Sequence, residues 1–274
     1  MAADAPLSGE RPRGAPGWRP VLDPTSSLIG FGAGLLNGLI GIGGGILIVP
    51  GLIFRRKVEV RVAVSTSLAA IMILSVVSFS LHVSFTGYSL SLAGSVLVIA
   101  SGMAAAQLGG WLLNRLPRRA VLLAFATITV LTASHLIVQA LGLVGSPAPS
   151  PEGPPLWSYP LFGTVSGLFS GLLGVGGGGW VVLGFTVFFQ TPVQGGLPIA
   201  LAMNVTNALS GVWAQRKSGQ ILWREVGRLI PAALVGIALG TTLAMTLPAD
   251  ALRMIFGAFF LFMAGRMFLH ALRR

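Results

Sequence analysis

Residues 30–50 read GFGAGLLNGLIGIGGGILIVP, and residues 163–183 read GTVSGLFSGLLGVGGGGWVVL. Glycines of the first stretch recur in the second, each 133 positions later. Among the shared positions are Gly34, Gly38, Gly41, Gly43, Gly44 and Gly45, which recur as Gly167, Gly171, Gly174, Gly176, Gly177 and Gly178. A constant offset over so many positions indicates an internal repeat, and we therefore expect the two halves of the chain to share one fold.

The repeat extends beyond these stretches, although the match becomes weaker. It continues through Gly87 and Gly219 to the Leu-Pro pairs at 116–117 and 247–248. Each half then holds four apolar stretches near the length of about 20 residues that a helix needs to cross a bilayer. The predicted segments are residues 26–54, 62–84, 91–114, 120–143, 158–190, 197–215, 229–247 and 251–269.

The composition places the chain in a membrane. Of its 274 residues 54% are hydrophobic and 9% are charged, against about 25% charged in an average soluble domain. The sequence therefore predicts an all-α polytopic membrane protein. Because the chain has no cysteine and three histidines, we expect no disulfide, metal site or cofactor. We assign the net charge of +11 to membrane topology and predict no nucleic-acid partner.

Proline-rich stretches delimit the two membrane halves. Residues 1–25 have no apolar run that could form a signal peptide, and we predict a disordered N-terminal tail there. Residues 144–157 carry five prolines and are predicted to be a solvated linker. The first membrane repeat is then residues 26–143, and the second is residues 158–274.

The distribution of Lys and Arg predicts how the segments cross. Positive clusters follow the first, third and sixth segments and end the chain, whereas the loops after the second, fourth and fifth segments carry no Lys or Arg. Since positive loops stay in the cytoplasm, the first and fifth segments must each begin and end on one side. Both are longer than the others and hold a glycine cluster near the middle, so we predict two re-entrant hairpins that break at glycine.

The two halves are predicted to be inverted relative to each other. One hairpin and three crossings give each half an odd number of crossings, which places a pseudo-two-fold axis in the membrane plane. Both termini are then cytoplasmic, and a bacterial inner membrane is the expected location. The alternative of eight full spans would place the positive cluster around Arg216 on the outside.

The glycine clusters are the predicted substrate site. Irregular backbone at bilayer depth is tolerated where it is buried in protein or lines a cavity. The half-helices that begin after the clusters would point free N–H groups and positive dipole ends at a shared space, which attracts anions. The alternative is that the glycines allow close helix packing, which we favour for the flanking pairs Gly34/Gly38 and Gly167/Gly171. The site glycines are Gly41, Gly43, Gly44, Gly45, Gly174, Gly176, Gly177 and Gly178.

Polar residues inside the segments complete the candidate site. Asn37 and its repeat partner Ser170 lie one turn before the glycine breaks, and Asn204 and Asn207 share one helix face. Uncharged amides and hydroxyls suit an oxyanion that must be bound and also released. The alternative is that such groups hold helices together. Further candidates along a path are Ser65, Thr66, Ser67, Gln107 and Thr206.

Carboxylates are absent from the predicted segments. The acids are Asp4, Glu10, Asp23, Glu59, Glu152, Glu225 and Asp250, all in predicted tails or loops. Carriers of cations generally need a buried carboxylate, so an anionic substrate is favoured. His82 and His135 lie toward the outer ends of their segments, where we interpret them as structural.

The paired motifs GLIGIGGGILIVP and GLLGVGGGGWVVL, each opening a half of four segments, resemble the TauE/SafE family of sulfite and organosulfonate exporters. The resemblance covers about residues 27–271. The second motif differs by having Gly179, Trp180 and Leu183 where the first has Ile46, Leu47 and Pro50. It implies a secondary transporter of the bacterial inner membrane for small sulfur-containing oxyanions such as sulfite, sulfoacetate or related sulfonates.

Two other classes of membrane protein stay open beside a carrier. One is an anion channel of the same architecture, and the other is a non-transporting assembly subunit or membrane enzyme. An enzyme needs a nucleophile or an acid and base in a pocket, and the segments offer scattered Ser and Thr, so we predict no enzyme. The predicted partners are a small anion and the lipid bilayer, and a homo-oligomer is left open.

Overall fold

A computed structural model describes residues 23–86, 92–143, 154–189, 193–215, 221–246 and 248, together with scattered helical residues between 251 and 269. The regular elements of these residues are helices, which confirms the predicted all-α class. Their bounds are α1 Pro24–Ile40, α2 Gly45–Arg56, α3 Val60–Thr86, α4 Leu92–Arg115, α5 Arg118–Ala140, α6 Ser158–Leu173, α7 Gly178–Phe189, α8 Val193–Gln215 and α9 Trp223–Thr246.

Five of these helices are long and apolar enough to cross a membrane. They are α3, α4, α5, α8 and α9, which lie at the second, third, fourth, sixth and seventh predicted segments. Large apolar side chains such as Trp111, Leu131 and Val235 are exposed on them, as expected where lipid rather than water covers the surface. The chain is a polytopic membrane protein.

The first and fifth predicted segments are not continuous helices. Each is divided into two shorter helices at its glycine cluster, with 17 and 12 residues in α1 and α2 and 16 and 12 residues in α6 and α7. At 1.5 Å per residue the longest of them is about 25 Å, shorter than the roughly 30 Å hydrocarbon core. None of these four helices is therefore long enough to span the hydrocarbon core alone. The breaks lie at the glycine clusters, as predicted.

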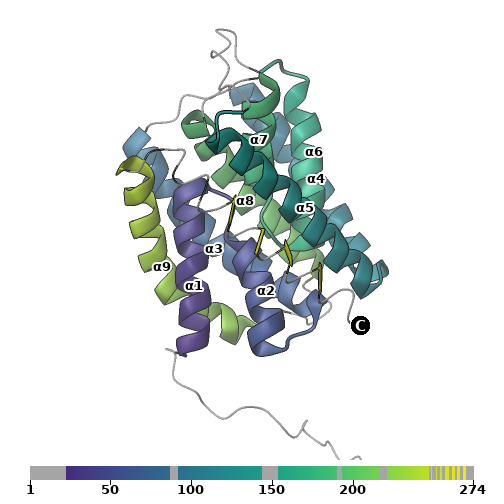
Figure 1. Cartoon of the computed structure of the whole chain (residues 1–274). Helices are drawn as coiled ribbons and strands as arrows, with labels where there is room; N and C mark the ends of the chain where they lie inside the picture. Colours follow the sequence, from purple (N-terminus) through teal and green to yellow (C-terminus); the bar gives the residue numbers. More distant parts are fainter. Residues whose placement is uncertain are drawn as a thin grey trace, which may run out of the picture.

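Each broken pair folds back on itself as a hairpin. Asp23, which caps the N-terminus of α1, forms an ion pair with Arg56, the last residue of α2. In the second pair, Trp157 at the start of α6 stacks edge-on against Phe189 at the end of α7, with ring centroids 5.9 Å apart. Figure 1 shows α1 and α2 side by side with the start of α1 and the end of α2 at the bottom of the view. We call α1 with α2 the first hairpin, and α6 with α7 the second hairpin.

The open ends of the two hairpins lie at opposite ends of the molecule. The first hairpin opens where α3 begins, because α2 ends at Arg56 and α3 starts at Val60. The 27 residues of α3 then cover about 40 Å before the chain reaches the start of α4. There a Cβ added at Gly94 would collide with the ring of Tyr159, near the start of α6.

Each hairpin packs on a spanning helix of the other half of the chain. The most extensive helix contacts are α1 with α9 and α6 with α4. Glycines make both interfaces close: a Cβ at Gly34 would overlap the backbone of Ala233, and one at Gly167 would overlap the backbone of Gly102. The packing interpretation of the flanking glycine pairs is thereby confirmed.

The largest boundary error concerns α9, which begins at Trp223 rather than near 229. Its first two turns contain Glu225, which was predicted to lie in a loop, and Arg228. The sequence-based prediction excluded these residues because they are charged rather than apolar. The structure explains them by ion pairing: Glu225 lies 2.5 Å from Arg228 and 3.5 Å from Arg56.

Some predictions fall on residues whose structure is not described. They concern the tail up to residue 22, the linker from 144 to 153, and much of the last segment after 250. The helix α1 begins at Pro24, just inside the range predicted as tail, because Asp23 accepts a hydrogen bond from the Thr25 N–H and proline suits the first helical position.

Candidate functional site

The tips of the two hairpins meet inside the molecule. Both α1 and α6 end at a glycine in the left-handed conformation, Gly41 with φ of 70° and Gly174 with φ of 65°, which only glycine adopts without strain. A Cβ added at Gly45, the first residue of α2, would collide with Gly174 and Val175 of the other tip. The two predicted clusters are therefore in direct contact.

Asn204 of α8 joins the two tips. Its amide Nδ2 donates to the Gly41 carbonyl at 2.7 Å, and its Oδ1 accepts from the Gly178 N–H at 2.6 Å. Ser67 of α3 donates from Oγ to the Gly174 carbonyl at 2.6 Å. All these side chains are fully buried. They form hydrogen bonds with carbonyl and N–H groups that the helix breaks leave unpaired, so their role is structural.

Asn37 fastens the first break in the same way. Its Oδ1 accepts from the Gly43 N–H at 2.9 Å, and its Nδ2 donates to Ser78 Oγ at 2.8 Å. Ser170, which takes the place of Asn37 in the second hairpin, is buried with a hydroxyl that makes no hydrogen bond within the described part of the chain. The paired positions therefore differ in their bonding.

Unpaired polar groups surround Gly177 at the second break. A Cβ there would collide with Ser166 Oγ of α6 and would lie 2.6 Å from Asn207 Nδ2 of α8. Asn207 and Ser166 are fully buried, and neither the Asn207 amide atoms nor the Ser166 hydroxyl has a partner among the described residues. Leaving such groups unpaired costs about 1–3 kcal/mol each, which requires an explanation.

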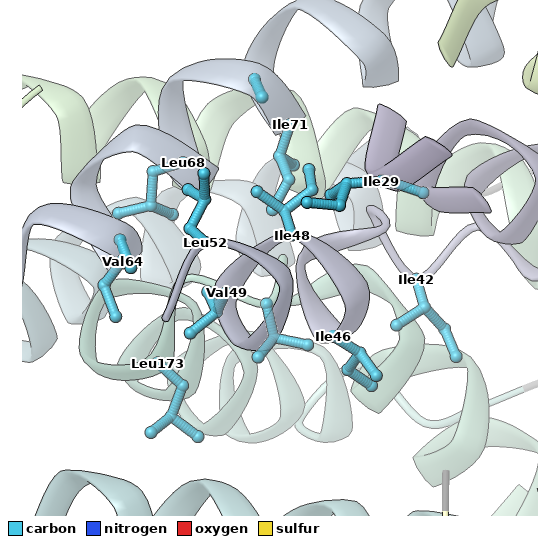
Figure 2. Close-up of a cluster of buried hydrophobic side chains, with 14 of the residues drawn as sticks. Ile29, Ile42, Ile46, Ile48, Val49, Leu52, Val64, Leu68, Ile71 and Leu173 are labelled. Atoms are coloured by element: carbon cyan, nitrogen blue, oxygen red, sulfur yellow. The ribbon is translucent and has the colours of Figure 1, made fainter. Parts of the chain in front are cut away.

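The positions of the first half that correspond to the polar residues near the second break are apolar. At the offset of 133 positions, Ser166, Asn204 and Asn207 correspond to Ala33, Ile71 and Leu74. A Cβ at Gly44 would meet Ala33, and one at Gly45 would lie 2.8 Å from the Ile71 side chain. Figure 2 shows Ile71 in the buried hydrophobic cluster around α2, together with side chains such as Ile46 and Val49.

The candidates along a predicted path lie elsewhere or are bonded. Ser65 donates to the Arg61 carbonyl, the Thr66 hydroxyl accepts from the Leu222 N–H, and Thr206 donates to carbonyls of its own helix. Gln107 is exposed on α4. Of the five, Ser67 alone bonds to a hairpin tip, and none belongs to the unpaired group around Gly177.

Ser166 is the polar residue at the tips that the sequence analysis missed. It lies inside the predicted segment 158–190, eight residues before Gly174, and was not among the predicted polar candidates. The signal was present in the aligned halves, because Ser166 and Asn207 are polar where Ala33 and Leu74 are apolar.

The described charges lie away from the tips. At the open end of the first hairpin, Arg56 pairs with Asp23 and Glu225, and Ser26 Oγ donates to Glu225 at 2.9 Å. The tips carry no Lys, Arg, Asp or Glu. Their electrostatic character therefore comes from amides, hydroxyls and the positive N-terminal ends of α2 and α7.

These features define an all-α polytopic membrane protein with uncharged polar groups at two facing helix breaks. The chain belongs to the sulfite exporter TauE/SafE family, whose model matches residues 26–196 and 159–274. This is a family of transporters, so the protein is not an enzyme.

Individual relatives agree with this class. The probable membrane transporter protein YunE of Bacillus subtilis is 24% identical over 249 residues, which cover 83% of this chain and 90% of that protein. The probable membrane transporter protein MJ0441 of Methanocaldococcus jannaschii is 26% identical over 200 residues, covering 70% and 72%. The probable membrane transporter protein YdhB of Bacillus subtilis is 31% identical over 107 residues, covering 39% and 40%. No solved structure matches the chain.

Proposed function

We propose that this protein is a secondary transporter that exports small sulfur-containing oxyanions, such as sulfite, sulfoacetate or related organosulfonates, across a bacterial inner membrane. The anion binds near the bilayer midplane, where the two hairpin tips meet. The residues proposed to form this site, in which Asn37 and Asn204 hold the tips in place, are Asn37, Gly41, Gly43, Gly44, Gly45, Ser170, Gly174, Gly176, Gly177, Gly178, Asn204 and Asn207.

The observation that carries this proposal is the contact between the tips. The N-termini of α2 and α7 both begin there, at Gly45 and Gly178. Helix N-termini present N–H groups and the equivalent of about half a positive charge each. Broken helices at the interface of two halves are also the usual place for substrate in secondary transporters.

The chemistry around the tips favours an anion over a cation. The surrounding side chains are amides and hydroxyls, and the described carboxylates lie near the open end of the first hairpin or beside it. A cation carrier generally needs a carboxylate at membrane depth. Sulfur oxyanions are proposed as substrates because the chain belongs to the sulfite exporter family.

We also propose that the two halves are inverted repeats with both termini in the cytoplasm. The packing of each hairpin on the other half supports this. Helix α1 packs on α9 as α6 packs on α4, and α9 has the same place in the chain order of its half as α4 has in its own. The positive residues Arg55, Arg56 and Lys57 lie at the open end of the first hairpin, which is therefore assigned to the cytoplasm.

Transport is tested with purified protein in proteoliposomes supplied in parallel with sulfite, sulfoacetate, sulfate and taurine. We expect saturable flux of sulfite or a sulfonate anion above that of protein-free vesicles. Counterflow, in which a preloaded anion accelerates uptake, distinguishes a carrier from an anion channel. The absence of flux for all four compounds would favour a non-transporting assembly subunit.

Topology is tested by single cysteines, because the native chain has none. We expect a cysteine at Lys57 to be labelled from the cytoplasm, and one at Gln194, just after the second hairpin, to be labelled from outside. Labelling of both from the same side would contradict the inverted arrangement. A cysteine at the exposed Leu143, which follows α5, is the outside control.

A further inference from the structure

The polar groups around Gly177 form a chemically distinct part of the proposed site. Asn207 and Ser166 come from two different helices, yet both reach the same glycine at the start of α7. Both are fully buried and unpaired within the described part of the chain. A buried polar group usually has a hydrogen-bond partner, so two of them at one point indicate a polar ligand.

The hydroxyl of Ser166 is bonded differently from those of many other helical serines and threonines. Several helical serines and threonines donate back to a carbonyl of their own helix, as Ser101 does to Leu97 and Thr164 does to Pro160. Ser166 and Ser170 lie one turn apart on α6 and make no such bond. Their hydroxyls are therefore available to another acceptor or donor.

The neighbouring Asn204 shows what a structural asparagine looks like at this place. Both ends of its amide are bonded, to Gly41 and to Gly178. Asn207 lies one turn further along the same helix with neither end bonded. The first break offers no equivalent group, because Ala33 and Leu74 occupy the corresponding positions.

We propose that the substrate is held by the second break alone, in a seat formed by the Gly177 N–H, Ser166 Oγ and Asn207 Nδ2, and that this seat takes a singly charged oxyanion. This inference rests on the proposed function and assigns its binding step to one half of the molecule. The first break then serves as the structural counterpart, closed by Asn37 and packed by apolar side chains.

The preference for a single charge follows from the composition of the seat. Its donors are uncharged, and the N-terminus of α7 supplies the equivalent of about half a positive charge. The cost of removing an ion from water rises with the square of its charge. A monoanion such as hydrogensulfite or a sulfonate is therefore preferred to a dianion of the same size.

Methanesulfonate and sulfate test this preference, because both are tetrahedral and similar in size but carry one and two charges. Binding is measured by isothermal titration calorimetry of the detergent-purified protein with each sodium salt. We expect the wild-type protein to bind methanesulfonate at least tenfold more tightly than sulfate. Equal or tighter binding of sulfate would overturn the charge preference.

The seat itself is tested by copying the first break into the second, with Ser166→Ala and Asn207→Leu. Since a hydrogen bond to a charged group is worth a factor of about ten to a hundred in affinity, each variant should bind methanesulfonate that much more weakly. Thr241→Val is the matched control, because it removes another buried, unpaired hydroxyl at the contact of α9 with Gly38. Its affinity should equal that of the wild type.

The outcomes separate this inference from the proposed function. If the wild type binds and transports an oxyanion but both seat variants bind it equally well, the seat is wrong and the proposed function stands. If the wild type neither binds nor transports any of the tested anions, both fail. Ser166→Ala removes one oxygen only, and it decides the question alone if Asn207→Leu does not purify as a monodisperse protein.

Discussion

The two helix breaks share a backbone but differ in the side chains around them. Both begin with a left-handed glycine and place a short helix against the opposite tip. Ala33, Ile71 and Leu74 of the first half correspond in the second half to the polar residues Ser166, Asn204 and Asn207. The repeated glycines thus preserve a geometry, whereas the neighbouring positions have diverged in chemistry. This indicates that fold and binding are specified by different residues.

The comparison is tested most strongly by filling each break. We expect Gly44→Val and Gly177→Val to abolish transport, because a Cβ would meet the backbone of Ala33 in the first case and Ser166 with Asn207 in the second. Flux into proteoliposomes is the measurement. Gly227→Val on α9 is the control, since nothing lies within 4 Å of a Cβ there. Unchanged flux in either tip variant would reduce that cluster to a packing device.

The second prediction separates two asparagines that lie one turn apart. Asn204→Leu should lower the free energy of unfolding by about 2–4 kcal/mol, because the Gly41 carbonyl and the Gly178 N–H lose their partners. Asn207→Leu should be within about 1 kcal/mol of the wild type or more stable, because its amide is unpaired. Thermal unfolding in detergent is the measurement. Equal loss of stability in both variants would contradict the difference in roles.

These residues show how far the sequence could predict the structure. The glycine offset located both helix breaks, and hydropathy located the spanning helices. The different roles of Asn204 and Asn207 could not be predicted from their spacing, because residues three apart share a helix face. Their hydrogen bonding depends on which backbone groups of the hairpin tips lie next to each side chain. Comparing the aligned halves at Ala33 and Ser166 would have drawn attention to the second break.

The charged first turn of α9 illustrates a different limit. The partners of Glu225 outside α9, Arg56 and Ser26, belong to the other half of the chain. No local pattern reveals a pairing of residues that lie so far apart in the sequence. These residues were predicted to lie in a loop, because charge usually ends a membrane segment.

The third prediction compares the open ends of the hairpins. The first is closed by ion pairs among Asp23, Arg56, Glu225 and Arg228, and the second by the rings of Trp157 and Phe189. Glu225→Gln should lower the free energy of unfolding by about 1–3 kcal/mol, because bonds to a partly buried charge are lost.

Salt provides the discriminating measurement. Raising the ionic strength should lower the melting temperature of the wild type more than that of Glu225→Gln, because screening weakens the remaining pairs less than the full network. Phe189→Leu changes the other open end without altering charge, and its effect on the melting temperature should not depend on salt. If the two variants respond to salt alike, the ion pairs do not determine the stability of the first open end.

The smallest effect is expected at the histidines, which lie outside both breaks. His82 is buried on α3, and its Nδ1 lies 2.9 Å from the Ser78 carbonyl oxygen. The hydroxyl of the same Ser78 accepts a hydrogen bond from Asn37. We expect His82→Gln together with His135→Gln to leave anion flux unchanged.

An inside-negative potential supplies about 2.3 kcal/mol per charge per 100 mV for expelling an anion, which supports roughly 50-fold accumulation outside. Export of a monoanion from the second break therefore needs no proton relay in the protein. Liposomes with a potassium and valinomycin potential provide the measurement, with flux that follows the sign of the potential as the expected result. Flux that ignores this sign, or that disappears in the double variant, would show that the histidines take part in electroneutral exchange.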